Sequence, residues 1–169
     1  ALSLAIEQGD IADATIAASE SQGEAFWRLR DSISEAERTE GPALQHDISV
    51  PVALMPEAMR QIETEVTGRW PGTEVISFGH LGDGNVHCHV RPPRDGDAAS
   101  WIAEHGQSAS ACVYAITTAL GGSISAEHGI GRVKRALLGE GDPARVAALR
   151  ALKAAFDPAG ILNPGVLIP

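Results

Sequence analysis

Residues 79–89 have the sequence GHLGDGNVHCH, in which three histidines flank the turn-forming segment GDGN. Glycine, aspartate and asparagine tolerate the positive φ values of a tight chain reversal, so residues 82–85 are predicted to form a hairpin turn. The flanking segments, 73–78 and 86–90, carry β-branched and aromatic residues and are predicted to be its two strands. The chain is therefore expected to contain antiparallel sheet.

The three histidines of this hairpin are expected to converge. His80 lies where the first strand enters the turn, and His87 and His89 share one face of the returning strand because strand side chains alternate. Imidazoles gathered at the mouth of a hairpin indicate a metal or catalytic site. The alternative for any one of them is an ordinary turn or surface histidine.

The rest of the chain alternates between helices and short strands. Residues 2–8 are predicted to end a helix, residues 11–18 fit a strand or a helix equally, and a helix capped by Ser19 or Ser21 is predicted to end before Gly41. The hairpin requires antiparallel pairing, so the predicted class is α+β, an antiparallel sheet flanked by helices. The further predicted elements are strands at 43–50 and 123–128 and helices at 57–66, 100–120, 132–138 and 143–156.

Composition excludes several classes of function. The formal net charge of −9 over 169 residues argues against nucleic acid as a partner, and no apolar run approaches the ~20 residues of a membrane span. The two cysteines, Cys88 and Cys112, form no CxxC motif, which is typical of a reducing compartment. The chain starts at Ala1, already in amphipathic register and without a signal-peptide pattern, so we expect it to be a segment of a longer protein.

The segment EHGIG at 127–131 is the best source of a further metal ligand. Divalent first-row ions favour imidazole and carboxylate, so Glu127 is the candidate third ligand after His80 and His87, with His128 beside it. His89 is a fourth ligand or a group that orients the site. In the alternative interpretation the glycines end a strand and Glu127 lies on the surface.

Arg30 is the candidate site for an anion. It lies on a predicted helix whose apolar face includes Phe26 and Leu29, and a guanidinium at a pocket edge binds a carboxylate with two hydrogen bonds. The alternative is a solvated arginine paired with Asp31 or Ser34.

Three motifs occur in an order that is typical of one known family. GHLGDGNVH at 79–87 precedes SAEHGIGRVK at 125–134 and FDPAGILNPG at 156–165. Together they closely resemble the C-terminal domain of FAD-linked oxidases, a family that includes D-lactate dehydrogenase, the glycolate oxidase flavin subunit and D-2-hydroxyglutarate dehydrogenase. FWRLR at 26–30 and HDISVP at 46–51 are also similar to family segments, so the resemblance spans about residues 20–169.

The resemblance implies that cofactor binding and substrate binding are divided between two domains. In such enzymes an N-terminal domain binds FAD, and this C-terminal domain caps the flavin and supplies the substrate site. The FAD-binding domain is therefore expected outside residues 1–169, and the chain alone is expected to be inactive. The implied cofactors are FAD and a divalent metal, with zinc first and manganese or iron as alternatives.

The resemblance also implies roles for individual residues. The metal ligands of the family fall on His80, His87 and Glu127, the catalytic base falls on His128, and the arginine that holds the substrate carboxylate falls on Arg30.

Further positions concern the substrate and the flavin. A substrate-facing threonine of hydroxyglutarate-type members is Ser34 here, which keeps the hydroxyl, and His89 stands at a substrate position where many members carry asparagine. A lysine often found before the HDISVP-like segment is Gln45, so a diacid that needs this lysine is expected to be less favoured. Asn163, in the C-terminal tail that lies against the flavin domain, is implied to be a cofactor-binding residue.

The predicted function is the oxidation of a D-2-hydroxy acid to the 2-oxo acid, with the hydride passing to FAD and a divalent ion polarising the substrate. His128 would take the hydroxyl proton, because an imidazole titrates near neutrality. The expected partners are the substrate, the FAD-binding domain, an electron acceptor and a second copy of the chain, and the expected location is the cytoplasm, or the mitochondrial matrix in a eukaryote. The alternatives are a non-catalytic metal-binding module and a structural domain.

Overall fold

The computed structural model describes residues 1–168 and divides the chain into two compact units. The first unit is Ala1–Gly41, and the second begins at Pro42. The predicted metal ligands and catalytic base belong to the second unit, whereas Arg30 and Ser34 belong to the first.

The first unit consists of the helices α1 (Leu2–Glu7), α2 (Glu20–Asp31) and α3 (Ile33–Thr39). α2 begins as predicted, because the Ser19 hydroxyl accepts a hydrogen bond from the Gln22 amide at 3.3 Å. Residues 11–18 form neither a helix nor a strand. The single helix predicted from Ser19 onward is interrupted at Ser32, whose hydroxyl donates a hydrogen bond to the Leu29 carbonyl at 2.8 Å.

The second unit is built on a three-stranded antiparallel sheet with the order β1-β3-β2. The predicted hairpin is formed by β2 (Glu74–His80) and β3 (Asn85–Arg91), and β1 (Leu44–Ser49) pairs with the other side of β3. The predicted hairpin and the α+β class are therefore confirmed.

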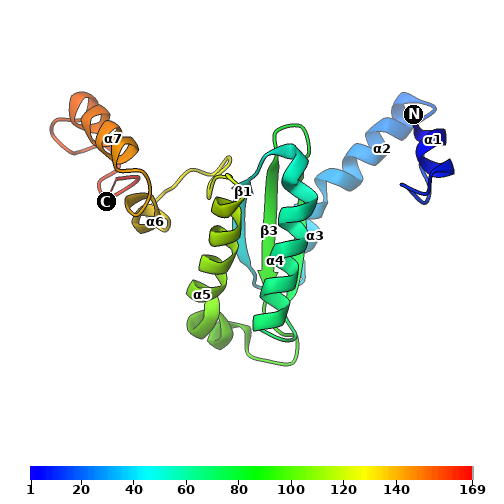
Figure 1. Cartoon of the computed structure of the whole chain (residues 1–169), viewed down its shortest axis with the longest axis horizontal. Helices are drawn as coiled ribbons and strands as arrows, with labels where there is room; N and C mark the ends of the chain where they lie inside the picture. Colours follow the sequence, from blue (N-terminus) through cyan, green and yellow to red (C-terminus); the bar gives the residue numbers. More distant parts are fainter. Residues whose placement is uncertain (169) are drawn as a thin grey trace. The chain divides into compact units, whose positions relative to one another are not determined.

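Two long helices cover one face of this sheet. α4 (Met55–Arg69) and α5 (Ala98–Ala119) pack against each other and against the strands (Figure 1). A single-turn helix, η1 (Val52–Leu54), leads into α4, and Pro56 lies in the first turn of α4 as expected. The core lies between these layers and includes Ile48, Val50, Met55, Ala58, Ile62, Val66, Val86, Cys88, Val90, Cys112, Val113 and Tyr114.

Alternation along β3 divides the sheet into two chemically different faces. Val86, Cys88 and Val90 belong to the core beneath the helices. Because neighbouring strand residues point to opposite sides, His87 and His89 lie on the face that α4 and α5 do not cover. We call this second surface the site face.

His46, on the helix-covered side, is a core residue. Its Nδ1 lies 2.9 Å from the Cys88 carbonyl oxygen, its Nε2 lies 2.9 Å from the Ser110 hydroxyl, and its ring meets the Tyr114 ring edge-on at 5.3 Å. Burial lowers the pKa of His46 to about 4, against an opposing effect of the Cys88 carbonyl. The imidazole is therefore neutral at physiological pH.

The chain ends with α6 (Arg135–Gly139), α7 (Pro143–Phe156) and a coil. α6 begins three residues later than predicted because residues 131–134 form turns. The Asp157 carboxylate organises the start of the coil: it accepts hydrogen bonds from the amides of Ile161 and Leu162, each at 3.0 Å, and forms an ion pair with Lys153.

The strand predicted at 123–128 is wrong. Only one isolated bridge forms in this segment, between Ser49 and Ser123, and the residues that follow are bends. The physical reason is that the amides of residues 126–128 donate hydrogen bonds to the Asp47 side chain. The Ala126 amide also reaches the Asp47 carbonyl at 3.3 Å, but the ladder does not continue beyond it.

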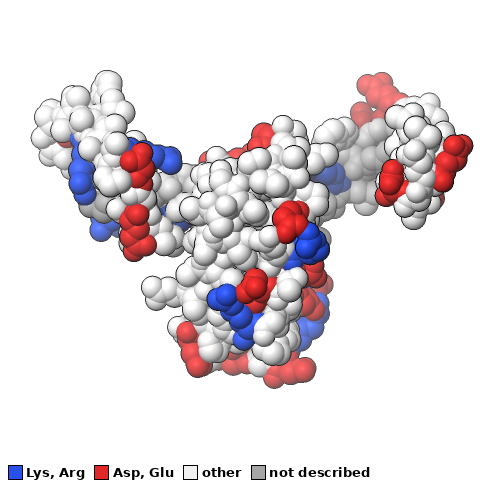
Figure 2. Space-filling model, in the orientation of Figure 1, with Lys and Arg blue, Asp and Glu red and all other residues white. Residues whose placement is uncertain are grey.

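The surface over the helices carries mixed charge. Figure 2 shows lysine and arginine side chains interspersed with aspartate and glutamate over this layer, and several form pairs within α4, such as Arg69 with Glu65 at 2.9 Å. Within residues 1–168 no helix is both long and apolar enough to cross a membrane.

The hairpin turn offers a matched pair of glycines. Gly84 has φ +79°, and a Cβ there would collide with the Val50 carbonyl oxygen, whereas a Cβ on Gly82 meets no atom within 4 Å. We expect Gly84→Ala to lower the free energy of unfolding by roughly 2 kcal/mol or more and Gly82→Ala to change it by less than about 0.5 kcal/mol. Urea denaturation of both variants measures this difference, and equal losses would contradict the turn geometry.

The buried His46 predicts a specific dependence of stability on pH. The folded-state pKa of about 4 lies below the ordinary 6.5, so between these pH values the unfolded chain binds a proton at His46 that the folded chain does not bind. His46 therefore stabilises the fold fully above pH 6.5, and this contribution, roughly 3 kcal/mol, is lost as the pH falls toward 4. Denaturant titrations between these pH values should give a flatter profile for His46→Gln than for the wild type; superimposable slopes would rule the effect out.

Candidate metal and catalytic site

The predicted metal ligands meet on the site face, at the end of the sheet where the hairpin turns. Glu127 Oε1 lies 3.3 Å from His80 Nδ1, and Glu127 Oε2 lies 3.8 Å from His87 Nε2. The two imidazole rings are 5.8 Å apart and nearly perpendicular. The structure therefore brings these side chains together from the hairpin and from a loop about forty residues later in the chain.

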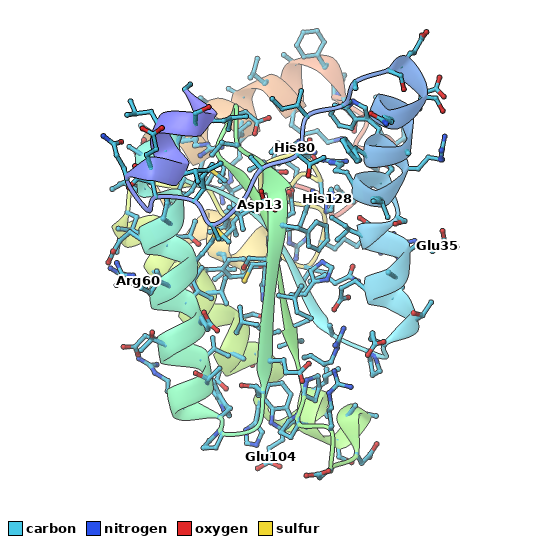
Figure 3. All side chains as sticks on the ribbon, turned by 90° about the vertical axis from the view of Figure 1, so that its right-hand side faces the viewer. Asp13, Glu35, Arg60, His80, Glu104 and His128 are labelled. Carbon is cyan, nitrogen blue, oxygen red and sulfur yellow. The ribbon has the colours of Figure 1, made fainter. Side chains whose placement is uncertain are left out.

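Three more charged or ionisable residues adjoin these ligands. Asp47 and His128 group with His87 and Glu127, and Asp83 groups with His80 and Glu127, all with potential ligand atoms within 4.8 Å of one another. Figure 3 shows His80 and His128 at the same end of the sheet, with Glu104 at the opposite end. We refer to Asp47, His80, His87, Glu127 and His128 as the cluster.

The donor set of the cluster fits a divalent first-row ion. Ligand atoms around a tetrahedral ion with bonds of about 2.1 Å lie about 3.4 Å apart, which is close to the spacings at Glu127. Neutral imidazoles and a carboxylate suit zinc, manganese and iron, and three protein ligands leave a position for a substrate oxygen. The role of His80, His87 and Glu127 as metal ligands remains a prediction.

His87 is held in the form that binds metals. Burial lowers the pKa of His87, and the nearby carboxylates of Asp47 and Glu127 act in the opposite direction without reversing the shift. The ring is therefore neutral at physiological pH, so its Nε2, on the side of Glu127, carries a lone pair when Nδ1 holds the proton.

His128 is the exposed member of the cluster. Its side chain is 66% exposed, and its ring stacks on that of His87 with centroids 5.7 Å apart and planes 20° apart. Its Nδ1 lies 3.9 Å from Asp47 Oδ2. An accessible imidazole beside the predicted ligands has the freedom to exchange a proton with a bound molecule, as the predicted base must.

Asp47, which the sequence interpretation did not select, is the most enclosed charged residue of the cluster, with 2% of its surface exposed. Its Oδ2 accepts hydrogen bonds from three successive amides, those of Ala126 at 3.1 Å, Glu127 at 2.8 Å and His128 at 2.7 Å. Its Oδ1 accepts one from Asn85 Nδ2 at 2.9 Å. Only the HDISVP segment hinted at this residue, and no pattern in it indicates a loop bound from another part of the chain.

These hydrogen bonds keep Asp47 ionised. Burial alone would raise the pKa of Asp47, but the amides of His128 and Glu127, the Asn85 side chain and the nearby His128 together lower it. Asp47 therefore places a fixed negative charge beside His87 and His128.

His89 lies farther along β3 on the site face. It is buried, its ring meets the Phe78 ring edge-on at 5.2 Å, and it stands directly opposite Gln45 of β1. Its position, two residues from His87, suits a contact with a substrate held at the cluster. That contact remains a prediction.

The other predicted residues lie apart from the cluster in the chain. Arg30, on α2, is exposed and forms an ion pair with Asp31 at 3.2 Å, as one alternative proposed, and Ser34, on α3, is also exposed. Asn163 lies in the C-terminal coil with φ 46°, a left-handed conformation that asparagine tolerates. Their substrate and cofactor roles remain predictions.

Comparison with known proteins identifies the family. Residues 1–167 match the family described as FAD linked oxidases, C-terminal domain. Relatives include D-2-hydroxyglutarate dehydrogenase of Stutzerimonas stutzeri, 37% identical over 95% of this chain and 34% of the relative. The mitochondrial D-2-hydroxyglutarate dehydrogenase of Rattus norvegicus is 34% identical over 97% of this chain and 29% of the relative. The chain thus spans about a third of the length of these relatives, and it belongs to the family of FAD-linked oxidase C-terminal domains.

Proposed function

We propose that this chain is the substrate- and metal-binding domain of an FAD-dependent dehydrogenase that oxidises a D-2-hydroxy acid to the 2-oxo acid. The observation that carries the proposal is the Glu127 carboxylate lying between His80 and His87 in a member of this family. FAD would be bound mainly by a domain outside these residues, and it would accept the hydride.

Each residue of the cluster has a distinct task in this proposal. His80, His87 and Glu127 would hold a divalent ion, which polarises the hydroxyl and carboxylate oxygens of the substrate when bound. His128 would take the hydroxyl proton, since it is exposed beside His87 and not enclosed among the ligands. Arg30 would hold the substrate carboxylate through two parallel hydrogen bonds.

The names of the relatives support 2-hydroxyglutarate as the first substrate to test. This acid carries a second carboxylate, and Gln45 supplies no positive charge for it. Gln45 faces His89 across β1 and β3, so an amide and an imidazole would offer N–H groups to that carboxylate. D-lactate and glycolate, which lack the second carboxylate, are the natural comparisons.

Metal binding tests the cluster directly. We expect the purified chain to bind zinc and expect His80→Ala and Glu127→Ala each to weaken binding at least tenfold, because each removes one of three proposed ligands. His105→Ala is the matched control: this histidine lies on α5, 3.7 Å from Glu104, and is expected to leave the affinity unchanged. Competition with a chromophoric chelator gives the dissociation constants. Wild-type affinity in both ligand variants would refute the assignment.

Substrate binding tests the proposed role of Arg30. We expect the zinc-loaded chain to bind D-2-hydroxyglutarate, and expect Arg30→Ala to weaken this binding by about tenfold or more, because a bidentate charge-assisted contact is lost. Arg28→Ala, on the same helix and 4.0 Å from Glu24, is the control. Calorimetric titrations with the D and L enantiomers and with D-lactate measure both affinity and preference.

Two outcomes would separate this proposal from its competitors. Zinc binding without any affinity for hydroxy acids would favour a non-catalytic metal-binding module. Dye reduction by these residues with added FAD and D-2-hydroxyglutarate would contradict the need for a separate flavin-binding domain.

A further inference from the structure

Asp47 joins parts of the chain that are distant in sequence. It lies on β1, while the amides that it binds belong to residues 126–128, and its side-chain partner Asn85 begins β3. Asn85 is itself fixed, because its amide also donates to the Ile48 carbonyl at 3.1 Å. The carboxylate thus binds the sheet to the loop that carries Glu127 and His128, next to the backbone bridge between Ser49 and Ser123.

The direction of the loop side chains depends on this contact. In a strand the neighbours Glu127 and His128 would point to opposite faces. In the structure the Glu127 carboxylate reaches His80 and the His128 ring stacks on His87, so both side chains lie on the site face. Three successive amides directed at one oxygen fix the backbone in the non-strand conformation that makes this arrangement possible.

The same carboxylate also faces the ring of His87. Asp47 Oδ1 lies 3.7 Å from His87 Nδ1, while His87 Nε2 lies on the side of Glu127. A carboxylate next to Nδ1 favours the tautomer that is protonated there, which leaves Nε2 free to bind a metal. The orientation of His87 is therefore part of what Asp47 supports.

The hydrogen bonds of Asp47 favour a supporting role over direct ligation. A carboxylate offers about four acceptor sites. Oδ2 accepts from the amides of residues 126–128, and Oδ1 accepts from Asn85 and lies 3.7 Å from His87 Nδ1. Ligation would require Asp47 to give up hydrogen bonds in a buried position, where unpaired amides are costly.

We propose that Asp47 is a positioning residue, which sets the metal affinity of the site by fixing the backbone of Glu127 and His128 and the ring of His87. This inference rests on the proposed function, because it concerns the same metal site. It differs in assigning a residue that acts through others and touches neither metal nor substrate.

The test combines zinc affinity with amide hydrogen exchange of the metal-free chain. Asp47→Asn keeps the volume of the side chain but removes its charge and turns one acceptor into a donor. We expect zinc binding to weaken about tenfold to a hundredfold, and the amides of residues 126–128 to exchange at least about tenfold faster. In a Glu127→Ala background, Asp47→Asn is expected to weaken zinc binding by a smaller factor than in the wild type, since the route through Glu127 is lost and the one through His87 remains.

Asp157→Asn is the matched control. Asp157 also accepts backbone hydrogen bonds, from Ile161 and Leu162, in the same unit and outside the cluster. Its substitution should speed the exchange of those two amides and leave the zinc affinity unchanged. A loss of zinc affinity in both variants would point to general destabilisation and overturn the proposal.

The remaining outcomes are also decisive. Wild-type zinc affinity in Asp47→Asn, with Glu127→Ala impaired, overturns the positioning role and leaves the metal site intact. Full additivity with Glu127→Ala would show that Asp47 does not act through Glu127 and overturn it as well. If the wild-type chain binds no zinc, the proposed function fails, and unchanged exchange at 126–128 in Asp47→Asn would then reject the backbone role independently. An Asp47→Asn chain that does not fold, beside a folded Asp157→Asn chain, assigns Asp47 a purely structural role.

Discussion

The hydrogen bonds between one buried carboxylate and three successive amides hold the site together. Asp47 lies on β1, and the amides of residues 126–128 belong to a loop with no regular secondary structure. A buried negative charge is tolerated only where donors surround it, and here the loop backbone supplies most of them. The loop amides therefore satisfy the hydrogen-bonding needs of the buried Asp47 carboxylate, and the carboxylate in turn fixes the backbone conformation of the loop.

A second charged group holds the other end of the loop. Lys134 is nearly buried, its Nζ donates to the Ile124 carbonyl at 2.7 Å, and it lies 5.8 Å from the centre of the Tyr114 ring. Burial lowers the pKa of Lys134, and the charge of Asp47 opposes this shift. The Asp47 carboxylate accepts hydrogen bonds from the amides of the loop, and the Lys134 side chain donates one to a carbonyl of the loop. Side chains thus replace the strand partners that the backbone would otherwise need.

The sheet serves two purposes through its two faces. On one face, Val86, Cys88 and Val90 pack beneath α4 and α5, and His46 is held neutral among them. On the other, the intervening His87 and His89 meet residues brought from elsewhere in the chain. Strand alternation alone separates a histidine of the core from histidines of the site. A packed core beneath the predicted ligands favours a preorganised site.

The sequence by itself determined the hairpin and the α+β class, because these depend on turn residues and on strand alternation. It also singled out His80, His87 and Glu127, which the structure brings together, and their role as metal ligands stays a prediction. The position of Asp47 beside His87 and His128 could not be predicted, since it depends on a contact between residues about eighty positions apart. The same contact explains why the strand predicted at 123–128 does not form. Local propensity favours a strand, but the amides of residues 126–128 donate to the ionised Asp47 carboxylate, which is a stronger hydrogen-bond acceptor than a backbone carbonyl. Local patterns predicted which residues gather on the hairpin and in the EHGIG segment, and only the tertiary structure decided how Glu127 and His128 come to lie on the same face, because that depends on the contact with Asp47.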